Sequence, residues 1–338
     1  MQESIEVTMK KRILLLDESG IFIRNALGGT KDLQNQRGNT TGGVFGYCGT
    51  LFGTMERFKP DHIICAVDSK VRPLFRKDIF PAYKANRKSV RDQIKDFSFQ
   101  QEALAQFHKL FCIPRVEVPG YEADDVIASL ATQYSEDGHE VFILSKDKDF
   151  VQLINKNTKL VLLGKHDKAQ EYEVVTHKDD LANVFGIDPK KAQCYQGIVG
   201  DTADNYPGAF SCGPAAAQKM LAKYSSLEEI YKNLDDPELF FDKKGKPNSL
   251  RLNLDRPVTK EETAKYLLDQ INIKTTKELV FLCRDLAKLE TKMKLNREKL
   301  LVDYYSKINS KKLIEFFEDL DFYSFIIMLE GAEEEQHE

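Results

Sequence analysis

Carboxylate side chains gather in one short stretch of the chain, between residues 120 and 149. Three of them stand at the start of an expected helix at 124–134, whose apolar residues recur at i, i+1, i+4 and i+5 and predict a buried face. Two more follow an apolar run at 141–144 that predicts a buried strand, and open α/β sheets bind ligands at the carboxyl ends of their strands. The five acids are Glu122, Asp124, Asp125, Asp147 and Asp149.

Four further acids follow strands or lie in turns elsewhere in the chain. Asp17 and Asp68 each end an apolar run that predicts a strand, and Asp201 and Asp204 stand three residues apart in a glycine-bearing loop. Each acid alone has an ordinary interpretation as a helix cap or a turn former. Crowded together, they would repel one another unless cations neutralised them, and a cluster of oxygen ligands suits Mg²⁺ or Mn²⁺ rather than zinc.

Basic residues are concentrated in a different stretch. The formal net charge of −4 argues against a nucleic acid partner, but assigning nine acids to metal ions leaves the rest of the chain net positive. Lysine and arginine dominate from Lys70 to Lys95, where Lys84 and Arg87 are about one helical turn apart. Such a run is ordinarily a solvated surface, but beside an acid cluster it predicts contacts with phosphate groups.

The expected elements would bring these residues together. Apolar runs predict strands near 12–17, 63–68, 116–118, 141–144 and 159–163, and helices at 96–111 and 124–134. This alternation is typical of an α/β fold with a largely parallel central sheet flanked by helices. We expect the α/β domain to span residues 1–190.

The rest of the chain, residues 191–338, predicts a mostly helical region. Expected elements near and beyond the boundary are helices at 179–185, 190–199 and 214–223, a polar loop at 235–257 and leucine-rich helical periods at 260–301. The segment 192–223 would form a helix-hairpin-helix-like unit with Gly208 and Gly213 in its hairpin. Backbone amides at such a helix start can bind a phosphate.

Composition excludes several classes of protein. No apolar run reaches the roughly 20 residues that a membrane span needs, and residues 1–11 are too polar for a secretory signal. We therefore expect a cytoplasmic protein with no membrane partner. The six cysteines are scattered without a Cys-x-x-Cys pair, which predicts reduced thiols and neither a zinc site nor a disulfide framework.

Five blocks of sequence resemble one known family. They are LLLDESGIFIR at 14–24, VDSK…FR…FPAYKANR at 67–87, GYEADDVIASLA at 120–131, LSKDKDFVQLI at 144–154 and GIVGDTADNYPG at 197–208. In this order and spacing they resemble the structure-specific 5′ nucleases. That family includes the 5′ to 3′ exonuclease domain of bacterial DNA polymerase I, flap endonucleases and stand-alone bacteriophage enzymes such as phage RNase H. In its size, the chain resembles the stand-alone bacteriophage enzymes most. A late block, KKLIEFFEDLDFYSF at 311–325, resembles the helix that ends this domain in the polymerase relatives.

The resemblance implies a PIN- or FEN-like fold and a reaction. The reaction is hydrolysis of phosphodiester bonds at 5′ ends or flaps of DNA with two Mg²⁺ ions, for which Mn²⁺ would substitute; all nine acids match the family's metal-binding acids. Lys84 and Arg87 match its catalytic basic pair at the scissile phosphate. Tyr83 matches a platform on which a terminal base stacks, and Arg76 is expected to contact DNA phosphates. The stretch 72–95 would form an arch over the active site.

The resemblance also implies partners. They are DNA with a 5′ flap, a nick or an RNA primer, and a single-strand binding or other replication protein that the acidic end 333–338 would recruit. We expect a monomer, located in the host cytoplasm if a bacteriophage encodes it.

Two positions depart from the family pattern. Ser211 stands at the middle glycine of the usual hairpin and would tolerate a positive φ poorly. Glu18 stands where many relatives have glycine after the first acid, a change that the sequence alone does not explain.

Three other functions remain open at this point. A topoisomerase–primase-type domain also uses a glutamate and an Asp-x-Asp after a strand, but it would leave the acids at 17, 68, 201 and 204 unexplained. A PIN-type ribonuclease would have a smaller acid set and no arch. A non-catalytic DNA-junction binding protein of the same fold would be expected to have lost some of the acids, and none is missing.

Overall fold

A computed structural model describes residues 9–71, 74–86, 90–163, 172–175 and 186–335 of the chain. Its centre is a six-stranded sheet with the strand order β3-β2-β1-β4-β5-β6. The strands are β1 (Arg12–Asp17), β2 (His62–Val67), β3 (Arg115–Glu117), β4 (Glu140–Ser145), β5 (Thr158–Leu163) and β6 (Tyr172–Val175). The first five are parallel and β6 is antiparallel to β5. The predicted fold class, α/β with a largely parallel sheet, is confirmed.

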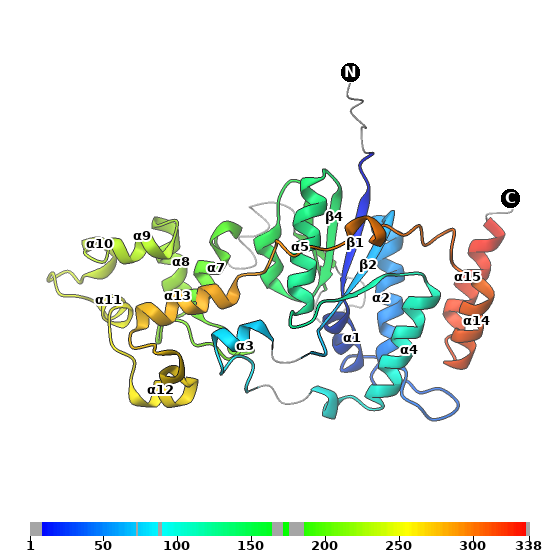
Figure 1. Ribbon diagram of the computed structural model, residues 1–338, viewed down its shortest axis with the longest axis horizontal. Coiled ribbons are helices and arrows are strands. Elements are labelled where there is room, and N and C mark those ends of the chain that lie inside the picture. Colours follow the sequence, from blue (N-terminus) through cyan, green and yellow to red (C-terminus); the bar gives the residue numbers. More distant parts are fainter. Residues whose placement is uncertain (1–8, 72–73, 87–89, 164–171, 176–185, 336–338) are drawn as a thin grey trace, which may run out of the picture.

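Helices cover both faces of the sheet (Figure 1). One face packs against α1 (Glu18–Ala26), α2 (Gly42–Phe58), α4 (Phe97–Leu110), α14 (Ser310–Asp319) and α15 (Tyr323–Glu335), and the other against α5 (Ala123–Glu136). Along β1, Leu14 and Leu16 belong to the first core and Ile13 and Leu15 to the second. Both faces are therefore buried, which is why these strands are continuous apolar runs in the sequence.

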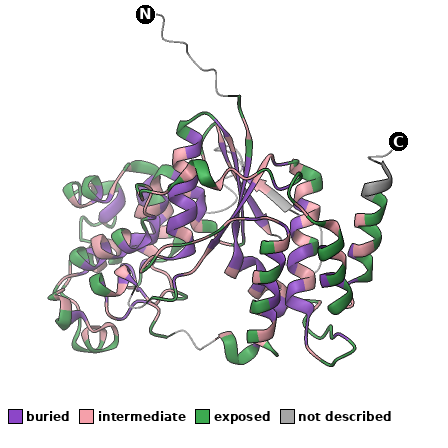
Figure 2. Ribbon diagram, turned by 45° about the vertical axis from the view of Figure 1, so that its right-hand side comes forward, coloured by how far each residue is buried: buried purple, intermediate pink, exposed green. Residues whose placement is uncertain are grey.

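A second helical region lies beside the sheet, at the left in Figure 1. It consists of α3 (Phe75–Ile79), α7 (Ala192–Val199), α8 (Pro214–Lys223), α9 (Leu227–Lys232), α10 (Pro237–Phe240), α11 (Ser249–Leu254), α12 (Lys260–Tyr266) and α13 (Thr276–Ala287). Figure 2 shows that buried residues are concentrated in the sheet and on the inward sides of the helices. Among the described residues, no helix is long and apolar enough to cross a membrane.

The chain returns from this helical region to the sheet in a form that the sequence did not predict. The prediction of helical periods throughout 260–301 is wrong for residues 288–296, which have no regular secondary structure. This segment runs along α5, where Ser129 Oγ donates a hydrogen bond to the Glu290 carbonyl and Tyr134 OH donates one to the Arg297 carbonyl. Side chains of α5 thus satisfy backbone groups that a helix would have satisfied internally. The predicted helix at 179–185 lies outside the described residues.

Candidate functional site

The predicted acids meet at the carboxyl edge of the sheet. The register pairs Leu16 with Cys65 and Leu144, so β1, β2 and β4 end at nearly the same level. A cavity of about 560 Å³ opens there, and among the described residues it is lined by eight carboxylates and three basic side chains. The eight are Asp17, Asp68, Glu122, Asp124, Asp147, Asp149, Asp201 and Asp204.

Asp17 is held at the junction of β1 and α1. Its Oδ1 caps α1 by accepting a hydrogen bond from the Gly20 amide at 2.8 Å, and its Oδ2 accepts one from Ser145 Oγ at 2.7 Å. A Cβ at Gly20 would lie 2.0 Å from Asp17 Oδ2, so glycine permits this approach. The pKa of Asp17 is raised to about 6, first by burial and then by the nearby Asp68 and Asp147 carboxylates, against the effect of the two hydrogen bonds.

Three other acids of the cavity share this shift. The pKa values of Asp124 and Asp149 lie well above the ordinary value and that of Asp147 is also raised, in each case first because of burial and then because of neighbouring carboxylates. Asp147 Oδ1 accepts a hydrogen bond from the Asp149 amide at 2.8 Å, and Gln196 donates one to Asp149. Neutral donors therefore orient Asp147 and Asp149.

Lys84 lies within the acid cluster. Its Nζ is hydrogen bonded to Glu122 Oε1 and lies 3.5 Å from Asp204 Oδ2. The backbone holds it there, because Lys84 has φ +55° and its amide donates to the Asp204 carbonyl at 2.9 Å. Burial would raise the pKa of Glu122, but the charges of Lys84 and Arg76 outweigh burial and lower it. Lys84 therefore occupies a position between two predicted metal ligands. Arg87, its predicted partner, lies outside the described residues.

Asp125 and Arg76 form an ion pair beside the cavity, and Arg76, which lines the cavity, also donates to Glu122 Oε2 at 3.1 Å. Asp125 is fully buried, accepts hydrogen bonds from Arg76 NH1 at 2.6 Å and NH2 at 2.8 Å, and is not among the residues that line the cavity. Arg76 is only 2% exposed and also donates to the carbonyls of Leu286 and Lys288. This arrangement differs from the predicted roles of Asp125 as a metal ligand and Arg76 as a DNA contact. Both side chains are already committed to each other.

Tyr83 also differs from its predicted role as a stacking platform. It is 2% exposed, and its hydroxyl contacts Glu122 Oε2 at 2.9 Å and Asp204 Oδ2 at 2.8 Å. Its ring packs with Tyr206 and Leu286 in a core of the helical region. The described middle part of the predicted arch, residues 80–86, is therefore docked on the helical region, and Tyr83 orients two acids of the cavity.

The loop that carries Asp201 and Asp204 is shaped by close backbone contacts. Asp201 Oδ1 accepts hydrogen bonds from the amides of residues 203 and 204. Gly208 has φ +65°, and a Cβ there would lie 2.4 Å from the Gly200 nitrogen. Ser211 adopts φ +65° as well, so the hairpin forms despite the serine, in a backbone region that serine rarely occupies. Gly213 has an extended φ of −86° and begins α8 as its cap.

Three polar residues of the site were not predicted from the sequence. Ser19 Oγ donates to Asp68 Oδ2 at 2.8 Å, and Ser145 and Gln196 hold Asp17 and Asp149. Ser145 precedes the Asp147–Asp149 pair by only two residues, so its place at the strand end was a usable signal. Gln196 comes from α7, and no sequence pattern marks it.

Comparison with known proteins shows which family the sequence matches. A family model described as the 5′-3′ exonuclease N-terminal resolvase-like domain matches residues 12–185, and one described as the 5′-3′ exonuclease C-terminal SAM fold matches residues 187–307. The 5′-3′ exonuclease of Aquifex aeolicus is 35% identical over 66% of this chain and 73% of its own length. DNA polymerase I of Caldicellulosiruptor bescii is 35% identical over 66% of this chain but only 26% of its own length. The chain thus spans about a quarter of that polymerase.

Solved structures show the same fold at low sequence identity. A phage T5 5′-exonuclease with bound zinc ions aligns with a TM-score of 0.58 and 16% identity over 92% of this chain and 98% of its own. The catalytic core of Rad2 in complex with a DNA substrate aligns with a TM-score of 0.53 and 14% identity over 94% of this chain and 90% of its own.

Proposed function

Because the chain belongs to the 5′-3′ exonuclease family, a family of metal-dependent nucleases, we propose that it hydrolyses phosphodiester bonds near the 5′ ends or 5′ flaps of DNA. The observation that carries this proposal is the cavity in which, among the residues that the structure describes, eight carboxylates meet with three basic side chains. Burial and neighbouring carboxylates raise the pKa values of Asp17, Asp124, Asp147 and Asp149, which supports a site that binds cations.

The donor set fits divalent metal ions. All eight side chains offer carboxylate oxygens, which are ligands that Mg²⁺ and Mn²⁺ prefer. We propose that they hold two Mg²⁺ ions and that Mn²⁺ substitutes. The chemistry that such ions supply is activation of a water and stabilisation of charge on the attacking and leaving oxygens. The protein's own contribution is to fix the acids: Ser145 and the Gly20 amide hold Asp17, and Ser19 holds Asp68.

Lys84 is the proposed catalytic cation that contacts the scissile phosphate. Its ammonium group now pairs with Glu122 and lies near Asp204, so it must exchange these partners for a phosphate oxygen. Neutralising the acids with divalent ions would weaken both attractions, because each ion competes with the ammonium for the same carboxylate oxygens. Its role there would be to stabilise charge at the scissile phosphate, with Arg87 as the predicted second cation.

Duplex DNA is the proposed partner of the neighbouring hairpin. Residues 208–213 lead into the ten-residue helix α8, whose first amides follow Gly213 and are suited to a backbone phosphate. The Rad2 neighbour is described in complex with a DNA substrate. A preference for RNA-primed ends, and recruitment of a replication protein through the acidic C-terminal residues, are further parts of the proposal.

A cleavage assay tests the function. Substrates labelled at the 5′ end would be a flapped, a nicked and an RNA-primed duplex, together with a single-stranded RNA, each with Mg²⁺ or with EDTA. We expect Mg²⁺-dependent cleavage of at least one duplex substrate. Cleavage of the single-stranded RNA alone would favour the PIN-type ribonuclease, and tight binding without cleavage in Mg²⁺ or Mn²⁺ would favour the junction-binding alternative.

A further inference from the structure

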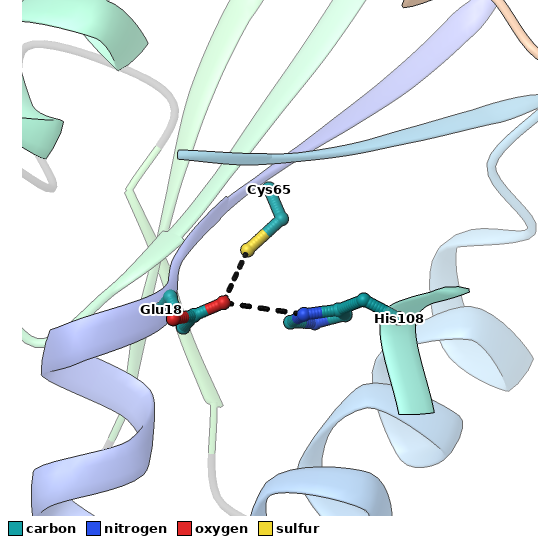
Figure 3. Close-up of side chains that lie close together, drawn as sticks. All are labelled: Glu18, Cys65 and His108. Carbon is teal, nitrogen blue, oxygen red and sulfur yellow. Dashed lines mark hydrogen bonds and ion pairs between the residues drawn. The ribbon is translucent and has the colours of Figure 1, made fainter. Parts of the chain in front are cut away.

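A second group of buried polar side chains lies next to the acid cluster. Glu18 follows Asp17 directly, but it is not among the residues that line the cavity. Figure 3 shows its carboxylate facing Cys65 of β2 and His108 of α4. Cys65 Sγ donates to Glu18 Oε2 at 3.4 Å, and His108 Nδ1 lies 3.2 Å from the same oxygen. All three residues are at most 2% exposed.

The strongest contact of this group is an ion pair with Arg115 of β3. Arg115 Nε donates to Glu18 Oε2 at 2.8 Å and its NH2 donates to Oε1 at 2.7 Å. This two-bond geometry fixes the orientation of the carboxylate as well as its charge. On the far side of the group, Tyr47 OH and His108 Nε2 are 2.9 Å apart.

Charge argues against a metal ion here, although glutamate, cysteine and histidine offer ligand atoms within 4.8 Å of one another. Arg115 already balances Glu18. Burial lowers the pKa of His108 and raises that of Cys65, so the imidazole and the thiol are neutral near pH 7. A divalent ion would therefore leave net positive charge in a buried site, which is costly.

The junction of β1 and α1 explains what this group does instead. Three consecutive residues bind three different parts of the sheet edge: Asp17 accepts from Ser145 at the end of β4, Glu18 binds Arg115 of β3, and Ser19 donates to Asp68 after β2. Only the Glu18 link is an ion pair, between a buried carboxylate and an Arg115 side chain that is 31% exposed. It reaches across β2, because β3 is the neighbour of β2 on the side away from β1.

We infer that Glu18 and Arg115 are positioning residues that fix the first turn of α1 and so set the separation of the Asp17 and Asp68 carboxylates for binding divalent ions. The inference rests on the proposed function, since it concerns the same metal-binding acids.

The test compares Glu18→Gln and Arg115→Met with Arg37→Met, which breaks an exposed ion pair in which Arg37 and Asp319 are 70% and 65% exposed. Three properties are measured: Mn²⁺ affinity of the DNA-free protein by electron paramagnetic resonance, flap affinity in EDTA by fluorescence anisotropy, and the melting temperature. We expect Mn²⁺ affinity to fall about 10-fold to 100-fold in the Glu18 and Arg115 variants, as for other residues that orient metal ligands. Flap affinity in EDTA should stay unchanged, and Arg115→Lys should recover part of the Mn²⁺ affinity.

The outcomes are separable. Unchanged Mn²⁺ affinity in Glu18→Gln, with or without a lower melting temperature, would show a purely structural role and overturn the inference. A parallel loss of flap affinity in EDTA would also overturn it, because it would indicate general damage to the site. If Arg115→Met does not fold, Glu18→Gln, which keeps the side chain's shape, decides alone. If the wild-type protein binds no Mn²⁺, the proposed function itself fails.

Discussion

Two sets of buried carboxylates lie near the carboxyl edge of the sheet, and their surroundings are opposite. Glu18 and Asp125 each receive two hydrogen bonds from an arginine. Burial alone would raise the pKa of Glu18, but His108 and Arg115 outweigh it and lower the pKa to about 2. The hydrogen-bond donors to Asp17, one residue before Glu18, are in the described part of the chain the Gly20 amide and Ser145 Oγ, both neutral, and its pKa is raised to about 6 by burial and by neighbouring acids.

The difference separates carboxylates that stabilise the fold from carboxylates that we expect to bind metal ions. An arginine-paired carboxylate needs nothing further from the solvent, and removing its partner leaves a buried charge. A crowded set without such partners costs stability until cations bind, which is typical of functional sites. The predictions below test this separation.

The largest effect should come from Asp147→Asn, in the set without arginine partners. Loss of a metal-binding carboxylate removes several kcal/mol of stabilisation at the reacting phosphate, and we expect flap cleavage at saturating Mg²⁺ to fall by about 1,000-fold. Flap affinity in EDTA should be retained. The matched control is Asp235→Asn, an exposed residue in the helical region. Near-normal turnover of the Asp147 variant would remove Asp147 from the metal site.

Arg76→Met should mainly reduce stability. It leaves Asp125 buried without its partner, which we expect to cost about 3–5 kcal/mol. The control Arg37→Met, in an exposed pair, should cost at most about 1 kcal/mol. Chemical denaturation of both variants measures this. The double variant Arg76→Met/Asp125→Leu should regain much of the loss, and a cost for Arg76→Met no larger than that of Arg37→Met would contradict the assigned pairing.

Lys84→Ala tests the role of the cation that lies between Glu122 and Asp204 in the cavity. We expect the single-turnover rate to fall by about 100-fold, as when one preorganised charge donor is removed from a reacting centre. Flap affinity should change much less. Lys156→Ala, an exposed lysine after η2 (Lys148–Leu153), is the control. Weaker binding with an unchanged rate would instead make Lys84 a binding contact.

The smallest effect concerns pH, and the two sets predict opposite signs. The ordinary pKa of 3.8 for Asp17 rises to about 6 in the fold, so its contribution to stability is present below about pH 4 and is lost as pH rises through about 6. The ordinary pKa of 4.5 for Glu18 falls to about 2, so its contribution is present above about pH 4.5 and is lost as pH falls through about 2. Melting temperatures with and without Mg²⁺ check this: Mg²⁺ should stabilise the protein more at about pH 7 than at about pH 5. Equal stabilisation at both would argue against the acid set.

The sequence predicted the sheet and the convergence of most acids because parallel strands end at one edge, so an acid after a buried run has a known location. It did not predict the orientation of neighbouring side chains on a helix start. Asp124 and Asp125 are adjacent, yet one lines the cavity and the other pairs with Arg76. The group around Glu18 joins residues up to 97 positions apart, and only tertiary structure brings them together. The antiparallel strand β6 and the irregular segment 288–296 were missed for the same reason, since their partners are distant in the chain.

Counting divalent ions on the DNA-free protein tests the central claim most directly. Mn²⁺ titration of the metal-free wild type at about pH 7.5, followed by electron paramagnetic resonance, should show two ions bound per chain, and Asp147→Asn should lose at least one of them. A wild-type protein that binds no Mn²⁺ at millimolar concentration, or that cleaves a 5′ flap equally well in EDTA, would contradict the account.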